Sequence, residues 1–441
     1  MFKLSNKTKV LSIVFLVLGA IGIVYGFLST PSKTSDVEDV VIQKYEAVPD
    51  AMESAPSIGL VQKAAEDIQT ADIAPSETTL QKTLHQLQAR PWAAVLVAAF
   101  FFLMIGLGTL VFQAVQYASE AGWSPVLYRV FEGITSYVLP GSIIVALIVL
   151  LAGTHFYPWQ NAELMASDGH LQIKALFLNF PSFVVRLVIY LLVWNVYRYM
   201  QRKNSLAQVD PNNFELAKKN HDMAVWFLVI FGLTESPMVW DWFMSMTPHW
   251  FSALYAFYIF ASLFVTAITA ITLITIMLKK AGYLEKVNDS HLHDLAKYMF
   301  AFSIFWTYFW FSQFMLIWYA NIPEEAAYFV LQITHYKLLF FGMLVTNFVF
   351  PILVLMNTDF KRSTWIINIV GTVILVGHYV TIYLVVVPQT VGIHGSFGVP
   401  ELGAILFFLG LFILVVGTAL GKVPLEVKGD PYIKESENYH Y

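Results

Sequence analysis

Two carboxylates interrupt an apolar run in the segment Gly232–Met246, GLTESPMVWDWFMSM. An ionised carboxylate at mid-bilayer depth costs roughly 2.5–3.5 kcal/mol on insertion scales, so such a residue faces a protein interior, pairs with a base or is protonated. Glu235 and Asp241 are six residues apart, roughly 600° of helical rotation, and therefore point to different sides of one helix. Pro237 frees the carbonyl of Leu233 and bends the helix beside Glu235, which favours a water site there.

Bases that can pair with these carboxylates lie on neighbouring apolar segments. Arg129 and Glu132 are three residues apart, a spacing that pairs side chains on one helical face. Arg186 lies one turn inside the apolar segment that precedes Glu235 and Asp241. Two alternatives follow: these charges pair with one another and hold helices together, or they serve proton or quinone chemistry.

A second set of polar residues follows one face of a later apolar segment. At 100° per residue, Tyr298, Tyr308, Ser312 and Tyr319 fall within roughly 40° of Asp294. Hydroxyl groups both donate and accept, as a proton-conducting hydrogen-bonded chain requires. The alternatives are hydrogen bonds to adjacent helices and, for Tyr319, a place in the interfacial aromatic belt.

Histidines occur on two of the last apolar segments. The stretch LQITHYKLLF carries His335 and Lys337, and the next segment carries His378. Two histidines on different helices can ligate a b-type haem. Hydrogen bonding or proton transfer by a side chain that titrates near neutrality is the favoured alternative.

The elements that position these residues are membrane spans. Of the 441 residues, 57% are hydrophobic and only 13% are charged, which is typical of a polytopic membrane protein. The chain has no cysteine, which excludes Cys-ligated iron–sulfur clusters, zinc–thiolate sites and covalently bound c-type haem from this polypeptide. The net charge of −4 argues against nucleic-acid binding, and no metal site is predicted.

An all-α fold with ten transmembrane helices is predicted. The expected spans are 10–28, 91–116, 126–152, 182–200, 223–246, 251–278, 297–320, 329–356, 364–387 and 401–420. Lysines and arginines gather before the first span and in alternate connections, which predicts that both termini are cytoplasmic. The first span is interpreted as a retained anchor because no small-x-small cleavage site follows it.

Residues 29–90 form a polar segment on the outer, periplasmic side. Short helices are expected at Ile58–Asp67 and Thr78–Ala89. The segment is too polar to build a core of its own, so docking onto a partner is the favoured role.

Two stretches carry residue patterns that are more specific than helical periodicity alone. They are WDWFMSMTPHWFSALY (Trp240–Tyr255) and YFWFSQFMLIWYANIPEE (Tyr308–Glu325), the second preceded by HDLAKY. They resemble the integral-membrane subunits of alternative complex III, the bacterial quinol:cytochrome c oxidoreductase, within the wider polysulfide-reductase-like (NrfD-like) family of membrane subunits. The resemblance covers roughly residues 91–420. The anchor followed by a polar segment resembles the smaller paralogue, quinone-binding subunit 2.

The resemblance implies a domain organisation and a set of partners. It implies two tandem four-helix bundles with one flanking helix at each end, in the bacterial inner membrane. The expected parts are an anchor (1–28), a periplasmic segment (29–90), a first bundle (91–247), a second bundle (248–390) and a last helix with a cytoplasmic tail (391–441). The implied partners are a second NrfD-like paralogue, an iron–sulfur subunit and c-type cytochrome subunits, which hold the clusters and the haem c.

The resemblance also implies site residues. Those that match family positions are Asp241 and His249 near the outer edge of the first bundle, and Asp294, Lys297, Tyr308 and Ser312 in the second. Three interpretations remain open. The chain docks redox partners and conducts protons, or it binds and oxidises quinol near the periplasmic face through Asp241 or His249, or it is a structural scaffold.

Overall fold

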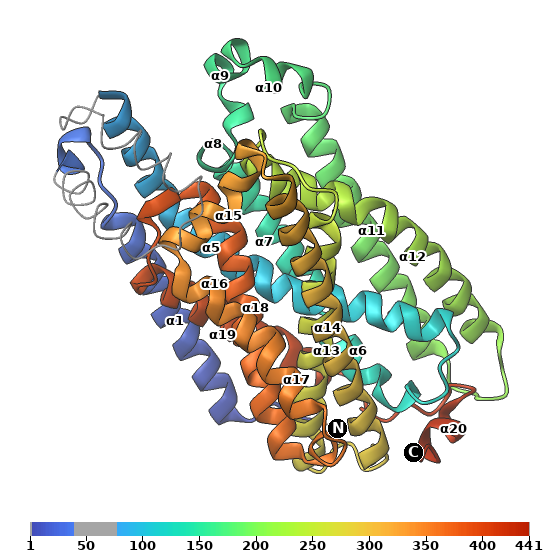
Figure 1. Cartoon of the computed structure of the whole chain (residues 1–441). Coiled ribbons are helices and arrows are strands. Elements are labelled where there is room, and N and C mark those ends of the chain that lie inside the picture. Colours follow the sequence, from blue (N-terminus) through green and yellow to red (C-terminus); the bar gives the residue numbers. More distant parts are fainter. Residues whose placement is uncertain (1, 39–76, 441) are drawn as a thin grey trace.

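The computed structural model describes residues 2–38 and 77–440, and these form an all-helical, multi-pass membrane fold (Figure 1). Within the described residues, ten helical segments are long and apolar enough to cross a membrane, one for each predicted span. They are α1 (Asn6–Leu28), α5 (Glu77–Ala118), α6 with α7 (Tyr128–Thr135 and Val138–Leu151), α11 (Phe180–Ala207), α12 (Glu215–Trp242), α13 (Tyr255–Lys280), α14 (Asp289–Ala320), α16 with α17 (Lys337–Leu344 and Phe350–Leu355), α18 (Thr364–Thr390) and α19 (Val399–Leu420).

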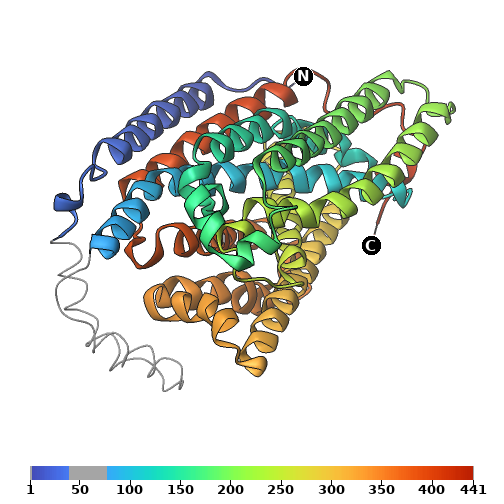
Figure 2. The ribbon, with the colours of Figure 1, turned by 90° about the horizontal axis from the view of Figure 1, so that it is seen from above.

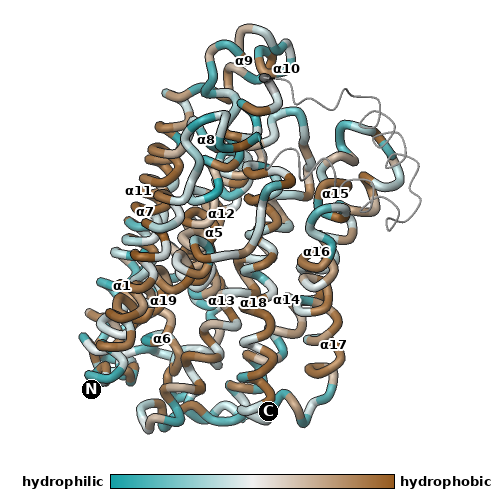
Figure 3. Tube along the Cα trace, turned by 90° about the vertical axis from the view of Figure 1, so that its left-hand side faces the viewer, coloured by the Kyte–Doolittle hydropathy of each residue, from teal (hydrophilic) through white to brown (hydrophobic). Residues whose placement is uncertain are grey.

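Both described chain ends lie at the same end of the molecule, together with the connections 208–214, 281–288 and 356–363 (Figure 1). We call this the basic end, because it carries most of the loop lysines and arginines. The opposite end carries the short helices α8 (Gly153–Phe156), α9 (Ala162–Ser167) and α10 (Gly169–Ile173). Hydropathy changes from hydrophilic at the two ends to hydrophobic along the helices between them (Figure 3). The positive-inside rule predicts that the basic end is cytoplasmic.

Helix α5 is the centre of the molecule. It packs against α7, α12, α13, α18 and α19, and nearly all of its apolar stretch is buried. A helix that is hydrophobic all round has no face for water, so burial on every side is the expected outcome. At Gly108 a Cβ would lie 2.5 Å from the carbonyl oxygen of Leu263 in α13, so this crossing requires glycine.

The other spans pack in two groups around α5. In the first group α11 contacts α12 and α7, and in the second group α13 contacts α14 and α18. Helix α14 also contacts α17, and α16 contacts α18. The polar residues predicted from the sequence therefore lie in two separate helical environments.

Helix α1 packs along α19, and the two lie side by side at one edge of the molecule (Figure 2). Glycines make the contact: a Cβ at Gly22 would lie 2.8 Å from the Cα of Gly403, and a Cβ at Gly410 would lie 2.6 Å from the carbonyl oxygen of Ser12. Small residues that let helix backbones approach closely are the usual way to join helices in a membrane, where burial alone gives no driving force.

Three details differ from the sequence-based expectation. The helix expected at 78–89 and the span expected at 91–116 are one continuous helix, α5, which runs through Pro91. The span expected at 329–356 is broken at Tyr336, between α15 (Pro323–His335) and α16, and contains a π-helical segment at Val345–Val349. The outer connection 152–179 folds into α8, α9 and α10, which no pattern predicted. The helix expected at Ile58–Asp67 lies outside the described residues.

Candidate functional site

Asp241 is a fully paired carboxylate in the interior of the first group. It is 1% exposed. The Nε of Arg186 donates to its Oδ2 at 2.8 Å, Nη2 of the same residue donates to Oδ1 at 2.6 Å, and the Tyr190 hydroxyl donates to Oδ2 at 2.8 Å. Arg186 is held in turn by the Ser182 hydroxyl at 2.7 Å and by the carbonyl of Phe177 at 2.9 Å. Asp241 is therefore paired with Arg186, and this ion pair joins α11 to α12.

Glu235 has a different environment one and a half turns earlier on α12. It is 6% exposed, and its Oε1 has no hydrogen-bond partner among the described residues. Its Oε2 has only the hydroxyl of the adjacent Ser236, at 3.5 Å, which is a weak contact. No lysine, arginine or histidine of the described residues forms an ion pair with it. Glu235 is thus a buried carboxyl group without a compensating charge, next to the helix irregularity at Pro237.

Glu132 forms the predicted pair with Arg129, at 2.7 Å, near the basic end. The pair is part of a larger cluster. The hydroxyl of Ser205 donates to Glu132 at 2.5 Å, and Arg129 donates to the hydroxyl and the carbonyl of Ser205, each at 3.2 Å. Arg202 donates to the backbone carbonyl of Glu132 at 2.9 Å. This cluster joins α6 to the last turns of α11.

Polar side chains line the buried face of α11 between these two ion pairs. Ser205, Gln201, Tyr197, Trp194 and Tyr190 are all buried and recur every three or four residues. The side-chain polar atoms of Gln201, Tyr197 and Trp194 have no hydrogen-bond partner among the described residues. Buried polar groups in native proteins are nearly always satisfied, commonly by water. The interior of the first group is therefore a polar column that runs from the Glu132 cluster to the Asp241 cluster.

This column adds residues that the charged positions alone did not identify. The signal was present in the sequence, because 190, 194, 197, 201 and 205 follow the spacing of one helical face. Gln113 on α5 belongs to the same category, since it is buried and both of its side-chain polar atoms lack a partner in the described part of the chain.

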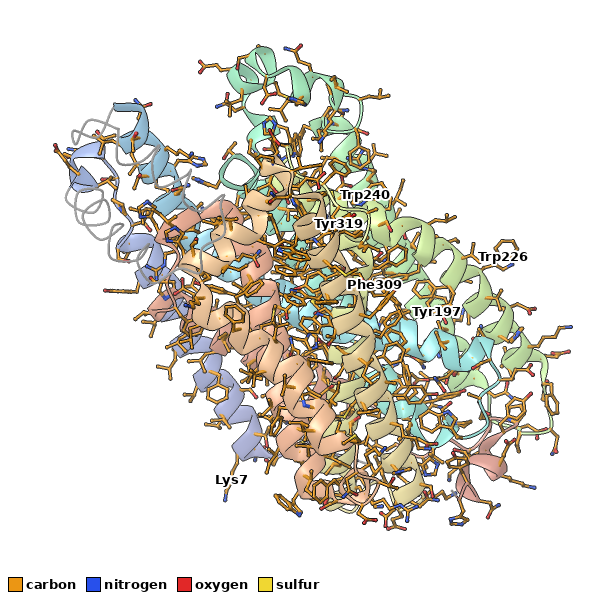
Figure 4. All side chains as sticks on the ribbon, in the orientation of Figure 1. Lys7, Tyr197, Trp226, Trp240, Phe309 and Tyr319 are labelled. Carbon is orange, nitrogen blue, oxygen red and sulfur yellow. The ribbon has the colours of Figure 1, made fainter. Side chains whose placement is uncertain are left out.

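The stripe that begins at Asp294 does not form an interior path. Asp294 accepts from the Tyr439 hydroxyl at 2.5 Å and pairs with Lys297 at 2.6 Å, both near the basic end. Tyr298 is half-buried against Trp123. Further along α14 the stripe reaches the surface, where Tyr308 is 63% exposed and Tyr319 is 84% exposed. Tyr319 is labelled in Figure 4. Ser312 on this side of the helix is half-buried.

The reason for this difference is the orientation of α14. The face that packs into the second group carries Ser303, Trp306, Trp310 and Gln313. The predicted stripe lies on the other side. Helical periodicity shows which residues share a face, but it does not show whether that face is turned inward. Tyr308 and Tyr319 therefore face outward in this chain, and a proton-relay role for this part of the stripe stays a prediction.

His335 and Lys337 flank the break at Tyr336, and both are exposed. His378 lies in a different environment. It is fully buried, its Nδ1 is 2.8 Å from the hydroxyl of Ser262, and its ring meets the edge of Trp306. His335 and His378 thus differ in burial, and haem ligation by the two remains the less favoured interpretation. The described residues contain no group of three or more His, Cys, Asp or Glu side chains that could hold a metal ion.

His249 lies in the connection after η4 (Met244–Met246), at the opposite end. Its Nε2 is 2.8 Å from the carboxylate of Asp168, and its side chain is half exposed. Partial burial raises the pKa of Asp168, but the N–H groups of Leu171 and His170 and the His249 imidazole together hold it below its ordinary value. Asp241 and His249 thus each have another partner, and they do not pair with each other.

A third ion pair, between Arg90 and Glu401, was not predicted. Arg90 on α5 donates from Nε and Nη2 to the two carboxylate oxygens of Glu401, at 3.0 and 3.2 Å. Glu401 also accepts from the backbone N–H of Gly398 at 2.8 Å and so caps the start of α19. The position of Glu401 in the first turn of a span was an available signal, because acidic residues favour helix N-termini.

Comparison of the sequence with protein-family models found no matching family, and comparison with curated proteins found no significant similarity. The structure shows a multi-pass helical membrane fold, and these two comparisons assign no biochemical role.

Proposed function

We propose that this chain is an integral-membrane subunit of a respiratory quinol:electron-acceptor oxidoreductase of the alternative complex III type. In this proposal it docks iron–sulfur and c-type cytochrome subunits beside a second NrfD-like paralogue in the bacterial inner membrane, and it conducts protons through the first group of helices. The resemblance of 240–255 and 308–325 to that family supports the assignment of the complex.

Glu235 is the observation that carries the proton-conducting role. A carboxyl group without a compensating charge is costly to ionise inside a membrane, and intramembrane ionisable groups are functional candidates for that reason. The polar column on α11 supplies hydroxyl, amide and indole groups that lead to the cluster at the basic end, and α11 packs against α12, which carries Glu235. Water molecules between such groups would complete a hydrogen-bonded path.

Quinol oxidation by this chain has weaker support. A quinol site needs an acid or histidine free to accept a hydrogen bond from the ring oxygen. Both oxygens of Asp241 are occupied by Arg186 and Tyr190, and His249 is paired with Asp168. A scaffold role fits Asp241 and Glu132, but it does not account for the unpaired Glu235.

The test compares the intact complex in liposomes, as wild type and with Glu235→Gln in this chain. The measured quantities are the rate of quinol oxidation and the release of protons to the outer medium. Asp294→Asn is the matched variant outside the polar column, and Glu324→Gln, at an exposed carboxylate, is the control. We expect Glu235→Gln to keep turnover and to lose proton translocation, and both other variants to match the wild type.

Each alternative has its own outcome. Loss of turnover by Glu235→Gln in an assembled complex favours a quinol site in this chain and contradicts the proton-path proposal. Unchanged turnover and unchanged proton release leave the chain as a scaffold. Loss of translocation in Asp294→Asn alone would place the path in the second group instead.

A further inference from the structure

An apolar groove opens on the surface of the α11–α12 hairpin near the basic end. Its volume is about 550 Å³. The floor is the ring of Tyr197 stacked on Phe227, with centroids 3.9 Å apart and an interplanar angle of 6°. Aliphatic side chains from both helices form its walls, and Trp226 lies at the rim. Trp226 is 68% exposed and projects outward from the edge of the molecule (Figure 4).

The mouth of the groove carries charges of both signs. Lys218 and Lys219 line it together with Glu215 and Asp222, and all four side chains are exposed. Neither lysine forms an ion pair with any residue of the described ranges 2–38 and 77–440. The lysines also lie in the first turns of α12, where the helix dipole favours an anion. The mouth thus offers a phosphate site flanked by two carboxylates.

The length of the groove corresponds to one leaflet of a bilayer. From Lys218 to Ile230 the helix rises about 18 Å at 1.5 Å per residue. Half of a hydrocarbon core about 30 Å thick is about 15 Å. A transmembrane helix would need a groove that crosses both leaflets.

We propose that this groove binds a phospholipid with a primary ammonium in its headgroup, namely phosphatidylethanolamine. The phosphate lies against Lys218 and Lys219, the ammonium lies against Glu215 or Asp222, and one acyl chain occupies the apolar channel over Tyr197. An anionic lipid without the ammonium would leave Glu215 without a cation, whereas Asp222 already contacts Nδ1 of His221 at 3.1 Å. This inference depends on the membrane setting of the hairpin and not on the proposed respiratory function.

The test measures bound lipid by native mass spectrometry of the full-length chain. The protein is exposed to an equimolar mixture of phosphatidylethanolamine, phosphatidylglycerol and phosphatidylcholine. Two variants address the site separately: Lys218→Gln with Lys219→Gln removes the phosphate contacts, and Val196→Trp fills the channel. The matched controls are Lys7→Gln with Lys9→Gln, two exposed lysines on α1, and Leu192→Trp, an exposed α11 position that does not line the groove.

We expect phosphatidylethanolamine to be retained in preference to the other two lipids. The lysine variant should lower its retention roughly thirtyfold, as expected when contacts to two lysines near a membrane surface are lost. Val196→Trp should lower it by blocking the apolar channel, and the controls should retain it like the wild type. Equal retention of all three lipids, a co-purified quinone in the groove, or unchanged retention in the lysine variant would overturn the proposal. The lysine variant decides the matter if Val196→Trp fails to fold, because both lysines are exposed.

Discussion

The two helical groups bury polar side chains in their interiors in different ways. The first group buries charges and pairs most of them, as Asp241 with Arg186 and Glu132 with Arg129. The second group uses neutral polar residues, and its only buried carboxylate among the described residues, Asp294, lies near the basic end. A charge in a low-dielectric interior is retained only if it is compensated or used. The difference directs attention to the first group, and within it to Glu235.

The second group shows how polar residues can be buried without charge. Thr266, Thr269 and Thr272 each donate to the carbonyl four residues earlier in α13, at 2.6 to 2.7 Å. His378 contacts Ser262 on α13. Such bonds satisfy these polar atoms within a helix or across one helix pair. Other buried polar atoms of the second group, including Ser303 Oγ, Trp306 Nε1 and Nε2 of His378, have no partner among the described residues, so the two groups differ in buried charge and not in buried polarity.

Removing one member of the buried ion pair should have the largest effect on stability. Arg186→Leu leaves Asp241 buried without a compensating charge, and we expect a loss of about 3 kcal/mol in the free energy of unfolding. The measurement is reversible unfolding of the chain in bicelles. Lys279→Met is the control, because the exposed pair of Lys279 with Asp289 should contribute less than about 1 kcal/mol.

The double variant Arg186→Leu with Asp241→Leu separates pairing from packing. Replacement of a whole buried ion pair by apolar residues is often nearly neutral. Recovery of most of the lost stability is expected. A double variant as unstable as Arg186→Leu alone would show that the arginine acts through its contacts with Ser182 and Phe177 rather than through Asp241.

Substitutions in the neutral interior of the second group should lower the free energy of unfolding by less. Ser262→Ala removes the hydroxyl that meets Nδ1 of His378 and leaves a buried imidazole nitrogen unsatisfied, a cost of about 1 kcal/mol. The same unfolding measurement applies, with Ser396→Ala, at an exposed position before α19, as a surface comparison. A loss as large as that of Arg186→Leu would contradict the contrast between the two groups.

The sequence allowed the spans to be predicted because length and apolar composition alone determine whether a helix can cross a membrane. The Arg129–Glu132 pair could also be predicted from the sequence, since a spacing of three residues places the two side chains on one helical face. The sequence could not choose between pairing and chemistry for Asp241. Helical periodicity shows which residues share a face, but the partner Arg186 is on another helix.

Two further features also could not be predicted from helical periodicity. The stripe from Asp294 was correctly aligned on one face, yet Tyr308 and Tyr319 turn outward because the bulky Trp306 and Trp310 occupy the interior side of α14. The break at Tyr336 could not be predicted, because no proline or glycine lies at that position. By contrast, the polar column on α11 follows a spacing that could have been read directly from the sequence.

Glu235→Gln should change stability very little, in contrast to changes at Asp241. The substitution keeps the size of the side chain and removes a group that cannot ionise without a buried, uncompensated charge. We expect a change within about 0.5 kcal/mol, or a small gain. Unfolding of the same chain in bicelles measures it, with Asp241→Asn as the partner variant. A large loss with Glu235→Gln would mean that its carboxylate is ionised and structurally paired, which would remove the basis for its proposed role.

The smallest effect should come from the exposed pair of Asp168 with His249, the surface counterpart of Asp241 with Arg186. The pKa of Asp168 is lower in the folded protein than its ordinary value, so the folded state binds its proton less tightly than the unfolded state does. Its contribution is therefore complete above the ordinary pKa of an aspartate and is lost as the pH falls through the lower folded value. Hydrogen exchange of α10, corrected for the intrinsic rate, should show reduced protection on acidification in the wild type. Asp168→Asn should show low protection with no such pH dependence, and identical pH profiles for the two proteins would show that this carboxylate does not hold the end of the first group.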